Sequence, residues 1–214
     1  MPMELTVVCL SYRGYWRSKG RPSERGLRLD AEAGVRWILE HHQKRAQDGN
    51  LASTPVLLVW GQSIGSGVAT NLAATCKLPL LIDGMLLETP FLSLREMLKV
   101  LYPQRWLPYK YLWPFLRNHL DSWANLGLIA KASKEDNRAP PNIYILEADR
   151  DELVPKEHGD LLYQRCRDVG IPARKGSAPV AYHNEAISRG EGKKLAAEAI
   201  FNLTKQALDR RGRE

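Results

Sequence analysis

Short apolar runs alternate with longer helical patterns along this sequence, and that alternation restricts the fold more than any other feature. Apolar, β-branched runs bounded by turn residues are typical of strands buried in a parallel sheet. We expect such strands at residues 6–11, 55–60, 80–87 and 142–147, with a weak last strand near residues 180–181. The expected helices cover residues 27–47, 67–76, 157–169 and 195–208. Strands that alternate with helices predict an α/β fold, a mostly parallel sheet flanked by helices.

The length and composition are those of one globular domain. The 214 residues are 44% hydrophobic and 26% charged, and no linker-like stretch divides them, so we expect a single domain over residues 1–214. The net charge of +7 is spread along the chain, with short basic clusters at residues 13–25 and 210–213. Nucleic-acid-binding proteins usually concentrate basic residues on one stripe, so we expect no nucleic-acid partner. Solubility or weak attraction to anionic membrane surfaces accounts for the charge.

The three cysteines lie far apart in the sequence and form no CxxC pair. This spacing argues against a disulfide framework and against a zinc site, and we expect no metal. We expect Cys9 and Cys76 to be small core residues, because both lie in apolar runs. No apolar run reaches the roughly 20 residues of a transmembrane helix, and the first residues lack a signal-peptide pattern. The sequence as it stands therefore predicts a cytoplasmic protein.

A G-x-S-x-G motif at residues 61–65 directly follows the strand expected at 55–60 and precedes a helix of small residues. A serine exposed by a strand-to-helix turn needs small neighbours, because the turn is tight and its backbone strained. It also lies at a helix N-terminus, where backbone N–H groups stabilise a developing oxyanion. This context makes Ser63 a candidate nucleophile.

A nucleophilic serine needs a general base, and the base needs an acid that holds its tautomer. With this motif the acid and then the histidine follow the serine along the chain. Four acids follow the strand at 142–147 or end it: Glu147, Asp149, Asp151 and Glu152. We choose Asp151, which precedes Leu-Val-Pro where the chain turns away from the strand, and Asp149 is the alternative.

His183 is the candidate base, because it follows the last expected strand and precedes the closing helix. The other histidines are less suitable by position. His41, His42 and His158 lie on predicted helices, where we expect solvated faces, and His119 belongs to an aromatic insert. That insert, residues 91–125, is rich in tryptophan, tyrosine and proline and lies where a lid over the site would be placed. A lid would favour an apolar acyl group as substrate; the alternative is ordinary peripheral packing.

Several ordered blocks of this sequence resemble those of a known family, the α/β-hydrolase-domain proteins of the bud-emergence-suppressor branch. The blocks begin at Tyr12, Pro22, Gly61, Glu88, Asp151 and His183 and read YRGY, PSExGL, GQSIG, ETPFLS, DxxVP and HNE. The resemblance implies an α/β-hydrolase fold and a serine hydrolase, with Ser63, Asp151 and His183 as nucleophile, acid and base. It also implies an esterase- or thioesterase-like activity, in some members on lipidated proteins, and frequent membrane association.

Family members carry a hydrophobic segment, further strands and a His-Gly loop before the strand that matches residues 6–11. The resemblance therefore makes this chain an incomplete domain that lacks the first strands. The absent loop normally gives one oxyanion-hole donor, which leaves the N–H of Gln62 as the other, and losing one donor costs about 10²–10³ in rate. We expect residues 6–11 either to pair with the strand at 55–60 or to leave a gap beside it.

Two functions from different classes remain open. The first is a cofactor-free serine hydrolase that cleaves small-molecule or acylated-protein esters or thioesters. The second is a catalytically impaired remnant or binding module that keeps the triad residues without a complete oxyanion hole. A charge-driven nucleic-acid or membrane-surface binder is a weaker third hypothesis. The sequence does not predict an oligomeric state.

Overall fold

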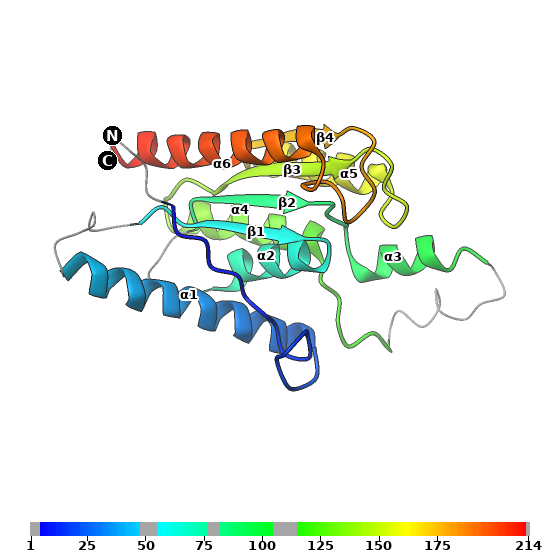
Figure 1. Cartoon of the computed structure of the whole chain (residues 1–214), viewed down its shortest axis with the longest axis horizontal. Helices are drawn as coiled ribbons and strands as arrows, with labels where there is room; N and C mark the ends of the chain where they lie inside the picture. The colour runs from blue at the N-terminus through cyan, green and yellow to red at the C-terminus, as the bar shows by residue number, and fades with distance from the viewer. Residues whose placement is uncertain (1–4, 48–54, 77–81, 105–114, 213–214) are drawn as a thin grey trace. The chain divides into compact units, whose positions relative to one another are not determined.

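The computed structural model describes residues 5–47, 55–76, 82–104 and 115–212 (Figure 1). Its contacts divide the chain into two compact units, Met1–Pro55 and Val56–Glu214. The second unit contains the sheet and every residue that we singled out as a candidate for catalysis.

Four parallel strands form the sheet of the second unit, in the spatial order β1-β2-β3-β4. They are β1 (Leu58–Gln62), β2 (Gly84–Glu88), β3 (Asn142–Ala148) and β4 (Ala173–Ala178). Their register pairs Gln62 with Glu88 and Glu88 with Leu146, so the carboxyl ends of β1, β2 and β3 lie together. Loops that leave these ends are the usual place for a ligand site in an open α/β sheet.

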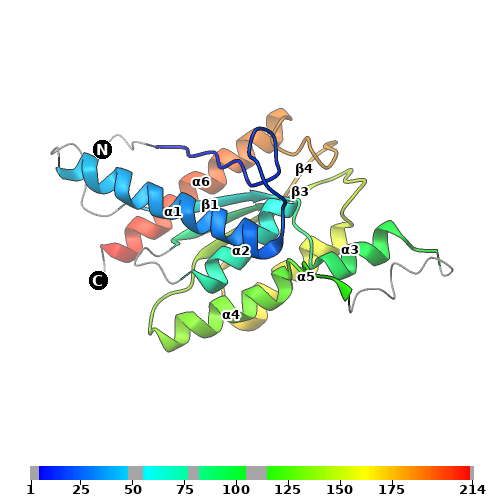
Figure 2. The same ribbon diagram turned by 90° about the horizontal axis from the view of Figure 1, so that it is seen from below.

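Helices cover both faces of this sheet. The helices of the second unit are α2 (Ile64–Thr75), α3 (Leu94–Leu101), α4 (Ser122–Glu135), α5 (Lys156–Val169) and α6 (Gly190–Arg211). Within it, α2 packs against α4 (Figure 2), α4 packs against α5, and α6 runs along the opposite face of the sheet (Figure 1). This three-layer arrangement confirms the predicted α/β class.

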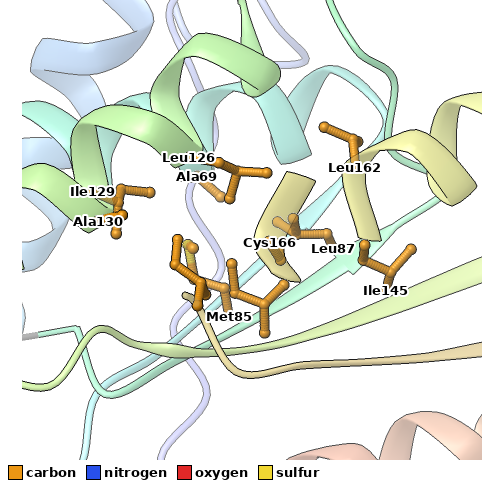
Figure 3. Packing of buried hydrophobic residues seen from close by; sticks show 11 residues of the cluster. Ala69, Met85, Leu87, Leu126, Ile129, Ala130, Ile145, Leu162 and Cys166 are labelled. Atoms are coloured by element: carbon orange, nitrogen blue, oxygen red, sulfur yellow. The ribbon is translucent and has the colours of Figure 1, made fainter. Parts of the chain in front are cut away.

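The alternation of side chains along each strand divides the core into two layers. Met85 and Leu87 of β2 face a cluster that includes Leu126 of α4 and Leu162 of α5 (Figure 3). Leu86, between them in the sequence, faces the other way and packs against Ala196 and Ala199 of α6. A strand buried on both faces has no polar alternation, which is why the sequence of β2 is a continuous apolar run.

The first unit contains α1 (Glu24–Gln47), which begins after Ser23, whose side chain accepts the N–H of Gly26 at 3.1 Å. Arg13 and Asp30 form a salt bridge of 2.6 Å that ties the preceding loop to this helix. Residues 5–12 have no regular secondary structure, and Val7 is 83% exposed, so the strand predicted at 6–11 is wrong. Of the two outcomes expected beside β1, the structure agrees with the gap, because among the described residues β1 has β2 as its only strand neighbour.

The other predicted elements are confirmed within a few residues, with one misplaced strand and two missed helices. The last strand lies at Ala173–Ala178 and not near residues 180–181, and neither α3 nor α4 was predicted. Of the aromatic insert, residues 105–114 lie outside the described residues, and with them Trp106, Pro108, Tyr109, Tyr111, Trp113 and Pro114. The predicted strand at 80–87 begins in another such gap, residues 77–81.

Three burial predictions are also wrong. Cys9 is exposed and Cys76 only half-buried, whereas Cys166 lies in the core. His158, expected on a solvated helix face, is buried. Among the described helices, none combines the length and the apolar content needed to cross a bilayer.

Candidate active site

Ser63 occupies a strained turn between the last residue of β1 and the first residue of α2. Its backbone has φ 49° and ψ −114°, a conformation that costs a non-glycine residue about 1–3 kcal/mol. The Ser63 N–H donates to the Glu88 carbonyl at 2.9 Å, and the Ser63 carbonyl accepts the N–H and the hydroxyl of Ser66. These bonds hold the turn, which leaves the Ser63 side chain half-buried at the end of the sheet.

The first glycine of the motif is required by this turn. A Cβ on Gly61 would lie 2.2 Å from the carbonyl oxygen of Gly65, far inside van der Waals contact. A Cβ on Gly65 would meet nothing within 4 Å. The close approach of β1 to the first turn of α2 therefore depends on Gly61, and the second glycine of the motif plays no such steric part.

Asp151 and His183 form a buried hydrogen-bonded pair. The Nδ1 atom of His183 lies 2.8 Å from Oδ2 and 3.0 Å from Oδ1 of Asp151, and the side chains are 4% and 7% exposed, respectively. Asp151 is held in turn by the N–H groups of Leu153 and Val154, which donate to Oδ1 at 2.9 and 2.8 Å. The main-chain N–H of His183 donates to Glu152 at 3.0 Å.

The environment of Asp151 keeps it ionised. Burial raises its pKa, but the hydrogen bonds from His183, Val154 and Leu153 and the charge of His183 together outweigh this, and the pKa lies below the ordinary 3.8. An ionised carboxylate at Nδ1 favours the tautomer that carries its proton on Nδ1. The Nε2 atom of His183 is then free to accept a proton.

The other acids considered from the sequence lie elsewhere. Asp149, the alternative to Asp151, is exposed, and Glu147 is buried beside Lys175, 3.3 Å from its Nζ. The structure therefore pairs His183 with the acid that we chose. One acid was missed: Glu88, the buried last residue of β2, whose carboxylate contacts Trp60 and Gln62. Two signals were available: its position at the end of an apolar strand and its place at the start of the ETPFLS block.

The structure brings the candidates to one end of the sheet but bonds only two of them. Ser63 follows β1, Asp151 follows β3 and His183 follows β4. No hydrogen bond joins the Ser63 hydroxyl to His183 among the described residues. Catalytic hydrogen bonds are often long in the absence of substrate, so this geometry does not exclude a nucleophile–base pair.

The remaining predicted residues are Gln62 and the histidines other than His183. Gln62 ends β1, is exposed, and its side-chain Nε2 lies 3.4 Å from Oε1 of Glu88. His41 and His42 lie on α1, and the carbonyl of His119 accepts the N–H of Leu94. In the described part of the chain no group of three or more His, Cys, Asp or Glu side chains is arranged to hold a metal ion.

Comparison with known proteins gives several relatives. The chain matches no protein-family model. It is 29% identical to protein bem46 of Schizosaccharomyces pombe, over 86% of this chain and 53% of that protein. It is 31% identical to the uncharacterized membrane protein YNL320W of Saccharomyces cerevisiae, over 86% and 56%, and 34% identical to the lysophosphatidylserine lipase ABHD12 of Macaca fascicularis, over 78% and 38%. The chain thus spans about half the length of the first two relatives.

Several solved structures that share the fold are esterases. The esterase Pf2001 of Pyrococcus furiosus aligns with a TM-score of 0.61 and 18% identity, over 91% of this chain and 67% of that one. The esterase Est2 of Thermogutta terrifontis aligns with a TM-score of 0.59 and 18% identity, over 90% and 70%. At this identity the likeness establishes the fold. The chain is thus an α/β-hydrolase-fold homologue of the bem46 and ABHD12 proteins.

Proposed function

We propose that this chain carries the site of a serine hydrolase that cleaves esters, with Ser63 as nucleophile, His183 as general base and Asp151 as the acid that orients it. The observation that carries the proposal is the buried Asp151–His183 pair, which lies at the same end of the sheet as the strained serine turn. Lipases among the relatives and esterases among the fold neighbours support the same chemistry.

The chemistry follows from the roles of these atoms. Nε2 of His183 accepts the Ser63 hydroxyl proton while Oγ attacks the acyl carbon, and Asp151 stabilises the imidazolium that forms. The tetrahedral intermediate collapses, the C–O or C–S bond to the leaving group breaks, and the imidazolium protonates that group. Water then attacks the acyl-enzyme, again through His183, and releases the acid and free Ser63. The reaction needs no cofactor.

For the oxyanion we assign the N–H of Ile64 in place of that of Gln62. In this fold the donor comes from the residue after the nucleophile. Ile64 is the first residue of α2, where N–H groups have no partner within the helix, whereas Gln62 is still part of β1.

The proposed substrate is a monoacyl ester with an apolar chain, such as a lysophospholipid; thioesters and acylated proteins are further candidates. The relative ABHD12 is named a lysophosphatidylserine lipase. The base of the aromatic insert lies over α2: Leu120 and Phe91 would be the nearest neighbours of a Cβ on Gly67. Apolar side chains in the described parts of the insert, on either side of residues 105–114, are exposed, namely Leu101, Tyr102 and Phe115. They support a lid for an acyl chain or a contact with a membrane surface.

Fluorophosphonate labelling tests the proposal, because the probe reacts covalently with an activated serine. We expect the wild-type chain to be labelled and Ser63→Ala to remain unlabelled. Ser11→Ala is the control, since it removes an exposed hydroxyl of the first unit that the mechanism does not use. A folded wild-type chain that the probe does not label would instead support the alternative function, a binding module with an impaired site. The absence of a hydrogen bond between Ser63 and His183 among the described residues favours that alternative.

A further inference from the structure

Glu88 ends β2, the strand that lies between β1, which leads to Ser63, and β3, which leads to Asp151. It is only 1% exposed. Its main-chain carbonyl accepts the N–H of Ser63 at 2.9 Å, so it directly supports the serine turn. Its side chain reaches toward residues 179–189, the loop between β4 and α6 that carries His183, which we call the histidine loop. There the N–H of Ile187 is a further hydrogen-bond partner of the carboxylate.

Three N–H donors surround this carboxylate. The indole Nε1 of Trp60 donates to Oε2 at 3.0 Å, the amide of Gln62 lies 3.4 Å from Oε1, and the third donor is the N–H of Ile187. A carboxylate has only acceptors, so a shell of donors alone suits the ionised form. Burial is the largest influence and leaves the pKa of Glu88 above its ordinary value, although the Trp60 and Ile187 bonds and the charge of His183 lower it.

We propose that Glu88 is a positioning residue of the site, whose negative charge ties β1 to the histidine loop and stabilises the His183 imidazolium. The inference rests on the proposed function, because the imidazolium forms when His183 accepts the proton of Ser63. Asp151 fixes the ring at Nδ1, and Glu88 adds a second negative charge from a neighbouring strand. A buried charge acts more strongly than an exposed one, because little water screens it.

The charged groups around His183 come from several elements. Asp151 and Glu152 come from the loop after β3, and Glu88 comes from the end of β2. On the histidine's own loop Glu185 is exposed and forms a salt bridge of 2.6 Å with Arg189. Of these carboxylates, Asp151 and Glu88 are the buried ones, so little water screens their charges.

Glu88→Gln tests the inference, because it keeps the size of the side chain and removes the charge. We expect the acid limb of the pH profile of fluorophosphonate labelling to move to lower pH, since the imidazolium loses a stabilising anion. We also expect about tenfold slower labelling at pH 8, because the amide N–H groups of the new glutamine would face three other donors and weaken the link between β1 and the histidine loop. Glu147→Gln, which neutralises a buried acid bonded to Lys175, should change neither quantity.

An NMR titration of the His183 ring gives a second readout that needs no activity. Its midpoint should fall in Glu88→Gln and stay in Glu147→Gln. Unchanged midpoints in both variants would overturn the inference and leave the proposed function standing. A wild-type chain that resists the probe would overturn the proposed function, and a shifted NMR midpoint would still support the electrostatic contact with Glu88.

Trp60→Phe covers the case in which Glu88→Gln fails to fold. Trp60 is largely exposed, so the smaller ring is tolerated, and the variant removes one hydrogen bond to Glu88 without changing any charge. We expect slower labelling, by about threefold to tenfold, with an acid limb that does not move to lower pH. A labelling rate equal to that of the wild type would contradict the claim that Glu88 links β1 to the histidine loop.

Discussion

Asp151 accepts a hydrogen bond of 2.8 Å from Nδ1 of His183, although the two residues are 32 positions apart in the chain. The loop after β3 carries the first and the loop after β4 the second, and adjacent parallel strands bring the loops together. Asp151 also accepts two main-chain N–H groups from its own turn. These main-chain bonds fix the orientation of the carboxylate independently of the histidine, so the pair has one defined geometry.

Asp151→Asn should slow labelling of Ser63 by about 10³–10⁴, because the amide stabilises the tautomer whose Nε2 already carries a proton. The measurement is the second-order rate constant of fluorophosphonate labelling at pH 8. Asp149→Asn is the matched control: it makes the same change two residues away on an exposed side chain and should label at the wild-type rate. Equal rates in the two variants would contradict the assignment of the acid.

The same pair should make stability depend on pH in an acidic window. The pKa of Asp151 lies below the ordinary 3.8, because hydrogen bonds from His183 and two main-chain N–H groups outweigh the effect of burial. A lowered pKa in the folded state stabilises the fold above the unfolded value, and this contribution disappears as the pH falls through the lowered pKa. We expect the wild type to exceed Asp151→Asn in free energy of unfolding by a constant amount above about pH 4 and by less below it.

Urea unfolding followed by circular dichroism between pH 2 and 6 measures this difference. Asp149→Asn again provides the control, since its exposed carboxylate lacks the buried bonds of Asp151. A difference between wild type and Asp151→Asn that stays constant down to pH 2 would mean that the pair contributes nothing to the pH dependence of stability.

Most of the fold could be predicted from the sequence, because β2 and β3 are short, nearly continuous apolar runs, which are typical of buried parallel strands. Strand β4 was misplaced because its sequence, ARKGSA, has almost no apolar content. It is a strand since β3 supplies a complete row of hydrogen-bonding partners, from Ile143↔Ala173 to Ala148↔Ala178. Such pairing between segments distant in the chain leaves no local signal.

The candidate triad rests on stronger sequence signals than its surroundings do. Ser63, Asp151 and His183 could be chosen because a motif and chain order restrict them. Glu88 could not, since its part depends on which side chains of β1 and of the histidine loop meet it. The burial of His158 was predicted wrongly for a similar reason. A helical pattern in the sequence does not show which face of the helix packs against the core.

The cysteines should differ sharply in reactivity. Burial raises the pKa of Cys166 to about 12, despite the opposing effects of a backbone hydrogen bond and the charge of Arg165. A thiol that stays protonated and shielded is a poor nucleophile. In native protein treated with iodoacetamide at pH 8, we expect Cys9 to be alkylated and Cys166 to remain free, as mass spectrometry of peptides would show. Equal alkylation in native and urea-unfolded protein would contradict the burial of Cys166.

The two glycines of the G-x-S-x-G motif should respond differently to the same substitution. Gly61→Ala places a Cβ 2.2 Å from the Gly65 carbonyl oxygen, so β1 and the first turn of α2 have to separate and the strained turn at Ser63 relaxes. Gly65→Ala places its Cβ in open space and removes a helix-destabilising glycine from α2.

We therefore expect Gly61→Ala to lose labelling of Ser63 by at least about 100-fold and to lower the melting temperature by several degrees, since overpacking of this kind costs about 1–3 kcal/mol. Gly65→Ala should melt at or slightly above the wild-type temperature and keep most of its labelling. Thermal unfolding and probe labelling of both variants give the answer. If Gly61→Ala labelled as fast as Gly65→Ala, the activation of Ser63 would not depend on the strained turn, and the role that we give to the turn would be wrong.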